Sequence, residues 1–308
     1  MPTPPLPEYR LSLAPEFVAE LAKSTTILPE WELKDGLLSP EIAQRYRRTL
    51  SGLSSVSVIA ATCEWLLNAL GSEGFVVLEL GGLLDAVDTQ DDGLRAITGL
   101  LSLIARPLRA FDRWPLWKPL GTNLAVDPMR ATGSGYDPMH IDVVNSTWPP
   151  DYSALFCVRP DPKGQGHSLV SQVRRAVDRL SYGDAELLSH PKYEDGVAFH
   201  DLSGVGREWS PFPVIDGHSP LGGFVRFTAK MLADADPDDP YTKAARALER
   251  ELASGQRRFP LRRGDLLIVN QHLCCHGREA LGDGEEDVPE DERQLLLQIF
   301  LRREEALS

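Results

Sequence analysis

The sequence predicts an α+β protein in which a double-stranded β-helix, or jelly roll, is preceded and flanked by helices. Three observations support this fold class. The N-terminal part of the chain has apolar residues at helical spacing. From Leu116 onward, short β-like runs are separated by Gly and Pro, as in barrels and jelly rolls. One of these runs carries a histidine and an aspartate two positions apart, and a further histidine lies far downstream.

The N-terminal elements, about residues 1–112, are expected to form a helical support for the later sheet. Ser39-Pro40-Glu41 predicts a helix start, because a hydroxyl cap precedes a proline and an acid in the first turn. The elements expected in this part are helices over 41–50, 56–70 and 94–108 and a short apolar strand over 74–80.

The remainder, about residues 113–303, is predicted to form the jelly-roll core of a single domain that spans 1–308. The candidate strands lie at 117–126, 139–144, 153–158, 167–170, 196–200, 223–227, 257–261, 265–269 and 294–301. Two helices, over 171–180 and about 240–253, interrupt them. Residues 283–292 are acid-rich and are expected to form a solvated loop.

The composition indicates a globular protein with a formal charge of −13. An acidic chain argues against nucleic-acid binding, because phosphate backbones need a basic face. No apolar run is long enough to span a membrane, and the N-terminus has no basic-then-apolar signal. The cysteines, at 63, 157, 274 and 275, form no paired framework. We therefore expect a protein of the reducing cytoplasm that acts on a small molecule.

His140, Asp142 and His276 are the candidate metal ligands. In a strand, residues i and i+2 point to the same face, so His140 and Asp142 are predicted to project side by side. His276 follows the predicted strand at 265–269 and can complete the set. Two histidines and one carboxylate leave the opposite coordination positions open, which suits non-heme Fe(II) and oxygen chemistry.

Other metal and hydrolytic sites are less favoured. His272 is a decoy or a partner of the ligands, since metal-bound imidazoles donate their free N–H to a nearby acceptor. The other histidines are expected to be surface or hydrogen-bonded residues: His167, His190, His200 and His218. Zinc binding by Cys274 and Cys275 is disfavoured, because two adjacent thiolates cannot easily face one ion. The Gly-x-Ser-x-Gly elbow of many Ser-His-Asp hydrolases is absent.

Three stretches of the chain, at 139–142, 150–175 and 264–278, carry a family resemblance. The first is Met139-His140-Ile141-Asp142, and the third ends in His276-Gly277-Arg278. Together they resemble the clavaminate synthase-like branch of the Fe(II)/2-oxoglutarate-dependent oxygenases, which is related to taurine dioxygenase. The resemblance implies a jelly-roll fold in which His140, Asp142 and His276 ligate Fe(II).

The resemblance also implies a binding site for 2-oxoglutarate. Ser168 stands where the family has a hydroxyl residue that holds the far carboxylate of 2-oxoglutarate, and Arg293 stands where an arginine pairs with that carboxylate. The loop between His276 and Arg293 is longer than usual, so Arg302 or Arg303 is the alternative.

The activity that the resemblance implies is hydroxylation of an unactivated C–H bond with O2, while 2-oxoglutarate is decarboxylated to succinate and CO2. Halogenating relatives have a small residue at the position of Asp142, so hydroxylation is expected, with desaturation or cyclisation as variants. The implied substrate is a free amino acid or a derivative in specialised metabolite biosynthesis. A carrier-protein-bound or peptide substrate is the alternative, and a jelly roll that only binds is a further one.

Asn145, Arg226 and Thr228 are the candidate substrate contacts. Arg226 can bind a substrate carboxylate or form a structural ion pair. Thr228 stands where relatives that act on guanidino amino acids tend to carry an acid, which argues against an arginine-like substrate.

Overall fold

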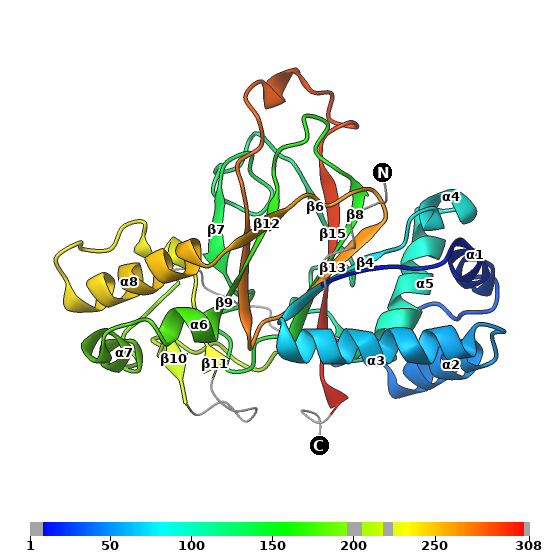
Figure 1. Cartoon of the computed structure of the whole chain (residues 1–308), viewed down its shortest axis with the longest axis horizontal. Helices are drawn as coiled ribbons and strands as arrows, with labels where there is room; N and C mark the ends of the chain where they lie inside the picture. Colours follow the sequence, from blue (N-terminus) through cyan, green and yellow to red (C-terminus); the bar gives the residue numbers. More distant parts are fainter. Residues whose placement is uncertain (1–8, 196–204, 218–223, 305–308) are drawn as a thin grey trace, which may run out of the picture.

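The computed structural model describes residues 9–195, 205–217 and 224–304, and these form an α+β fold. Figure 1 shows strands gathered in the centre, with helices α1–α5 on one side and helices α6–α8 on the other. No helix among the described residues is long and apolar enough to cross a membrane.

Among the described residues, the helices of the N-terminal part are α1 (Pro15–Ser24), α2 (Pro40–Ser51), α3 (Val56–Ser72), α4 (Leu83–Ala86) and α5 (Gln90–Leu101). The predicted helices over 41–50 and 56–70 match α2 and α3 closely, whereas α1 and α4 were not predicted. At the start of α2, the Ser39 hydroxyl accepts a hydrogen bond from the Ile42 N–H, as the cap predicts. The predicted helix over 94–108 is wrong at its end. Pro107 cannot continue a helix, and the chain instead forms a strand, β5 (Arg106–Leu108).

A large sheet crosses the molecule and receives strands from both parts of the chain. Its order is β1 (Arg10–Ser12), β4 (Phe75–Glu79), β13 (Asp265–Asn270), β8 (Tyr152–Arg159), β15 (Leu295–Arg302), β5, β3 (Leu37–Leu38) and β2 (Leu33–Lys34); β6 (Lys118–Gly121) also pairs with β15. One face packs on α1, α3 and α5 through apolar residues such as Leu78 and Ile268. The predicted division of the chain near residue 112 stays a prediction.

A small sheet faces the large one. Its order is β12 (Arg257–Phe259), β9 (Ser168–Gln172), β14 (Cys274–Arg278) and β7 (Asp137–His140). Its outer face is covered by α6 (Val173–Val177), α7 (Tyr182–Leu188), α8 (Pro240–Ser254) and the hairpin of β10 (Ile215–Asp216) and β11 (Phe224–Val225). Between the sheets, Leu155 and Leu267 of the large sheet join Val170 and Cys274 of the small one in one apolar cluster. This two-sheet core positions the site.

Several predicted strands differ in extent from those observed. The strand at 117–126 shrinks to β6, the strand at 139–144 ends at His140, and β14 was not predicted at all. The predicted strand at 196–200 lies outside the described residues. The acid-rich loop is mostly exposed, as expected, but Glu285 is buried in a short 3-10 helix, η2 (Glu285–Asp287).

Candidate active site

Two histidines face each other across the small sheet. His140 ends β7 and His276 lies in β14, and the two are direct partners in the antiparallel ladder. Directly opposed residues share a face, and the two imidazole rings have their centroids 4.5 Å apart. Along β14 the side chains alternate. Cys274 packs into the core between the sheets and Cys275 into the outer core, so His276 turns inward.

A turn, and not the strand, brings the carboxylate to the histidines. The sequence predicts His140 and Asp142 on one strand, but β7 ends at His140 and Asp142 begins a turn. Val143 in that turn has a φ of 56°, a left-handed conformation that is strained for a β-branched residue. The Asp142 N–H donates to the Gln271 side-chain carbonyl at 2.6 Å, which ties the turn to the segment before β14.

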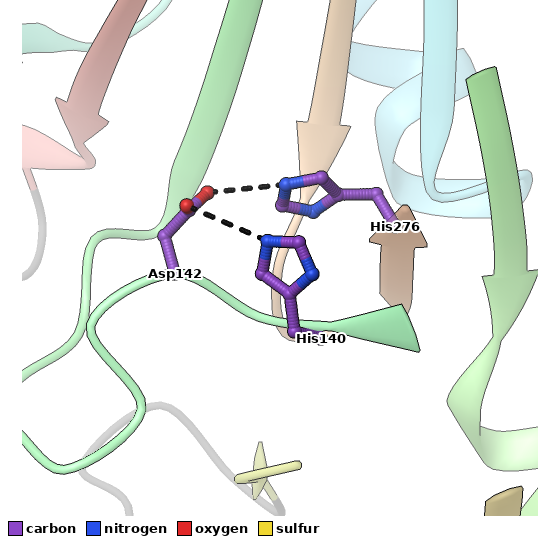
Figure 2. A group of neighbouring side chains, drawn as sticks. All are labelled: His140, Asp142 and His276. Carbon is purple, nitrogen blue, oxygen red and sulfur yellow. Dashed lines mark ion pairs between the residues drawn. The ribbon is translucent and has the colours of Figure 1, made fainter. Parts of the chain in front are cut away.

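The three side chains converge (Figure 2). The Asp142 carboxylate lies 3.3 Å from Nε2 of His276 and 3.9 Å from Nε2 of His140. Candidate ligand atoms of all three lie within 4.8 Å of one another, and no other such group occurs among residues 9–195, 205–217 and 224–304. The predicted ligand set is therefore brought together by the fold.

Hydrogen bonds fix the state of these groups. Nδ1–H of His140 donates to the Pro138 carbonyl at 2.7 Å, which leaves Nε2 as a lone-pair donor toward the carboxylate. Burial lowers the pKa of His140 to about 4 and so favours this neutral form. Burial acts to raise the pKa of Asp142, but His276 and His140 together hold it below its usual range. Gln298 donates to Asp142 Oδ1 at 3.1 Å and steadies the carboxylate.

The residues fit a divalent metal. Oδ2 of Asp142 is buried and accepts no hydrogen bond among the described residues, although Nε2 of His276 lies only 3.3 Å from it. Two nitrogen donors and one carboxylate oxygen suit Fe(II), with open positions for further ligands. The thiolate alternative is excluded by geometry, because Cys274 and Cys275 pack into different cores on opposite faces of β14.

A cavity of about 630 Å³ opens beside the ligands, within the size range of small-molecule sites. Its wall includes His140, Asp142 and Thr228, together with Trp114, Lys118 and Gln298. Thr228 is thus the one predicted substrate contact that lines the cavity. Asn145 is buried and does not line it.

Arg226 has a structural role in place of the predicted substrate contact. Its side chain is 3% exposed, and its Nε donates to Asp216 at 3.0 Å. The rest of the guanidinium donates to the carbonyls of Val144, Ser146 and Thr147. Arg226 does not line the cavity, and its buried ion pair with Asp216 agrees with the structural alternative.

Ser168 begins β9 and lies beside Arg278, a buried cation to which the sequence analysis gave no role. Its ladder partner in β14 is Arg278, two positions beyond His276 and on the same face. Arg278 donates to the carbonyls of Gly133 and Gly135. No carboxylate among the described residues pairs with it, and its Nε is buried without an acceptor. The i+2 spacing between His276 and Arg278 could have predicted that both side chains lie on one face of a strand.

Arg293 precedes β15 and is half-buried, with its Nε donating to the Val288 carbonyl. It approaches the same region as Arg278. Burial raises the pKa of Glu285, and among the cations that oppose this shift are Arg293 and Arg278. Both guanidinium groups therefore act on the charge of Glu285, and Arg278 is the ladder partner of Ser168.

The alternative arginines belong to another cluster. Arg302 is fully buried and pairs with Asp151 at 3.4 Å, and Arg303 lies 3.7 Å from the same carboxylate. His272 also binds Asp151, at 2.6 Å, which identifies it as a structural residue and not a partner of the metal ligands.

Comparison with known proteins identifies the family. The family model described as taurine catabolism dioxygenase TauD, TfdA family matches residues 38–298. The chain belongs to the TauD/TfdA family. This confirms the resemblance inferred from the sequence and the predicted class of enzyme, a dioxygenase.

Individual relatives agree with this assignment. The chain is 30% identical over 137 residues to L-asparagine oxygenase from Streptomyces coelicolor, a match that spans 42% of this chain and only 38% of that relative. A structure of asparagine oxygenase with Fe(II), 2S,3S-3-hydroxyasparagine and succinate superposes with a TM-score of 0.70 at 18% identity, over 96% of this chain and 93% of the other.

A structure of the non-heme iron oxygenase OrfP with Fe and α-ketoglutaric acid gives a TM-score of 0.66 at 18% identity, over 95% of this chain and 93% of the other. At this identity the likeness shows the fold, and it confirms the predicted jelly roll. The iron and α-ketoglutaric acid in those structures agree with the predicted metal and co-substrate.

Proposed function

We propose that this protein hydroxylates an unactivated C–H bond of a free amino acid or a derivative in a specialised biosynthetic pathway, with 2-oxoglutarate decarboxylated to succinate and CO2. The observation that carries the proposal is the convergence of His140, Asp142 and His276, the first two of which line a cavity large enough for a small substrate.

The metal would be held by Nε2 of each histidine and by the Asp142 carboxylate. Bound Fe(II) supplies the oxidising chemistry with O2 and 2-oxoglutarate. The residues of the chain do the positioning. Pro138 fixes the His140 tautomer, Gln298 holds the carboxylate, and the turn at Val143 presents it to the histidines.

The far carboxylate of 2-oxoglutarate is assigned to Ser168 and Arg293, with Arg278 beside them. The support is the inward face of β14, on which Arg278 follows His276, and the register that puts Ser168 opposite Arg278. A buried guanidinium without a carboxylate partner is suited to a bidentate carboxylate ligand.

The substrate class is supported by the relatives. The asparagine oxygenase and OrfP structures hold hydroxylated amino acids. Thr228 is the proposed substrate contact on the cavity wall. Desaturation or cyclisation at the same metal, and a carrier-bound or peptide substrate, are the competing forms of this proposal. The cytoplasmic location also stays a proposal, consistent with free thiols at all four cysteines.

Two measurements test the proposal. Under anaerobic conditions, Fe(II) and 2-oxoglutarate added to the purified protein should produce a visible charge-transfer band. Aerobic incubation with a panel of amino acids should then give succinate at a rate that the substrate stimulates. A protein that develops no band would contradict the proposal. A band with no stimulation by any free amino acid would favour a tethered substrate.

Alanine variants of Arg278 and Arg293 show which of the two arginines binds the far carboxylate of 2-oxoglutarate. Replacing the arginine that contacts the far carboxylate by alanine should raise the KM for 2-oxoglutarate about ten- to a hundredfold, as expected for a charge-assisted pair. Glu286→Ala, an exposed change in the same loop, is the control and should leave this KM unchanged. If neither arginine variant alters the KM, the assigned site is wrong.

A further inference from the structure

Lys118 occupies an unusual place in the cavity. It lies in β6, directly opposite Gln298 of β15, and both side chains line the cavity beside Asp142. Opposed residues of an antiparallel pair have Cβ atoms about 5 Å apart, so the two side chains reach the same part of the wall. The Lys118 ammonium sits over the ring of Trp114, 3.6 Å from its centroid, which places it at a defined position.

This ammonium has no anionic partner within the described ranges 9–195, 205–217 and 224–304. None of their ion pairs or hydrogen bonds involves it, in contrast to Lys230 on the same wall, which pairs with Asp137 at 2.7 Å. The carboxylate with the largest charge effect on Lys118 is Asp142. A divalent metal bound by Asp142 would neutralise the charge of that carboxylate. Lys118 would then be a half-buried cation without a counter-ion among the described residues.

Gln298 presents the complementary group. Its amide nitrogen donates to Asp142 at 3.1 Å and to Ser153 at 3.2 Å, which uses both of its hydrogens. Its carbonyl oxygen accepts no hydrogen bond from any described residue and is therefore available to a ligand N–H. The pair thus offers one cation and one hydrogen-bond acceptor, side by side next to the metal ligands.

We infer that Lys118 binds the carboxylate of the substrate while the Gln298 carbonyl accepts the N–H next to it. The inference rests on the proposed function and narrows its substrate class. The substrate is an α-amino acid or N-acylamino acid whose carboxylate is free. A thioester on a carrier protein lacks that carboxylate, so the site favours the untethered acid.

The test uses matched ligands and a matched variant. Binding is measured as the thermal shift of protein loaded anaerobically with Fe(II) and 2-oxoglutarate. The ligands are the standard L-amino acids, their N-acetyl derivatives and their α-carboxamides. For the acids that bind, we expect the carboxamide to bind at least tenfold more weakly and the N-acetyl acid to retain binding.

Lys118→Met keeps the length of the side chain and removes its charge. It should weaken binding of the acid about ten- to a hundredfold, the effect of one charge-assisted hydrogen bond, and abolish the preference over the carboxamide. Lys118→Arg should retain the preference. Lys243→Met, on the exposed surface of α8, is the control and should behave as the native protein.

The Fe(II)–2-oxoglutarate absorption band is recorded for every variant, because it tests the proposed oxygenase function separately from the role of Lys118. The absence of this band in the native protein would contradict the proposed function itself. With the band intact, three results overturn the Lys118 assignment: no free acid binds, acid and carboxamide bind equally well, or Lys118→Met weakens 2-oxoglutarate and leaves the acid unaffected. A Lys118→Met protein that has lost the band is replaced by Lys118→Gln in the same comparison.

Discussion

Two aspartates of this protein, one buried and one largely buried, each lie beside histidine, yet their surroundings differ in charge. Asp151 lies 2.6 Å from His272 and is also paired with Arg302 and Arg303. Asp142 lies 3.3 Å from His276, with His140 and the neutral amide of Gln298 as its other near neighbours. The first cluster is balanced by two guanidinium groups, whereas no guanidinium group of the described residues pairs with Asp142.

The difference separates a structural cluster from a binding site. Because buried charge is costly without compensation, the two guanidinium groups stabilise the ionised Asp151 carboxylate in the folded protein. The Asp142 cluster leaves a carboxylate oxygen without a donor and two imidazole nitrogens turned toward it. A divalent cation supplies the missing charge. His272 and His276 are four positions apart in one segment of the chain. The spacing of these residues alone could not show that His272 belongs to the Asp151 cluster and His276 to the Asp142 cluster.

The largest expected effect follows from removing the metal carboxylate. Asp142→Ala should abolish the Fe(II)–2-oxoglutarate band and lower turnover more than the roughly 10–100-fold typical of losing a partner that only orients a ligand. The metal-free variant should unfold at a temperature no lower than the native apoprotein, since an unpaired buried charge is removed. A band that persists would show that Asp142 is not a ligand.

The converse change is Asp151→Ala. Removing one partner of a buried ionic cluster costs about 3–5 kcal/mol, because Arg302 and His272 would lose their interactions with the Asp151 carboxylate. Urea denaturation should show this loss of unfolding free energy, while the folded fraction still develops the absorption band. Loss of the band with unchanged stability would reverse the roles that we assign to the two aspartates.

A smaller effect is expected at Gln298, which donates to the metal carboxylate. Gln298→Leu keeps a similar volume and removes that donor, and it should lower the affinity for Fe(II) about 10–100-fold, as partners of metal ligands do. Competition with a chelator measures this affinity. Gln256→Leu, an exposed change that leaves Asp142 untouched, is the control.

The smallest effect concerns Cys274 and Cys275, which lie between His272 and His276 in the sequence. Burial raises the pKa of Cys274 to about 12 and that of Cys275 well above its ordinary value. Below such a pKa the thiol stays protonated, so the reactive thiolate is a minute fraction at pH 8. Iodoacetamide should therefore leave both residues unmodified in the folded protein and alkylate both in guanidinium chloride, as peptide mass spectrometry can show. Modification without unfolding would contradict the packing of β14.

Much of the fold could be predicted from local patterns. The start of α2 followed from Ser39 and Pro40, and the short apolar runs at 265–269 and 294–301 gave the extents of β13 and β15 closely. The patterns failed where tertiary contacts decide. Residues 106–108 form a strand because β15 lies alongside them, and β14 is short and carries polar residues that hide its period.

The amino-acid sequence by itself determined the chemistry that this protein can offer: two imidazoles, one carboxylate and the family that uses them. Only the tertiary structure decided that His140 pairs with His276 across a ladder, that a strained turn delivers Asp142, and that Lys118 faces Gln298 in the cavity. The physical reason is that periodicity fixes which face a side chain occupies, whereas the register between distant strands depends on packing of the whole core.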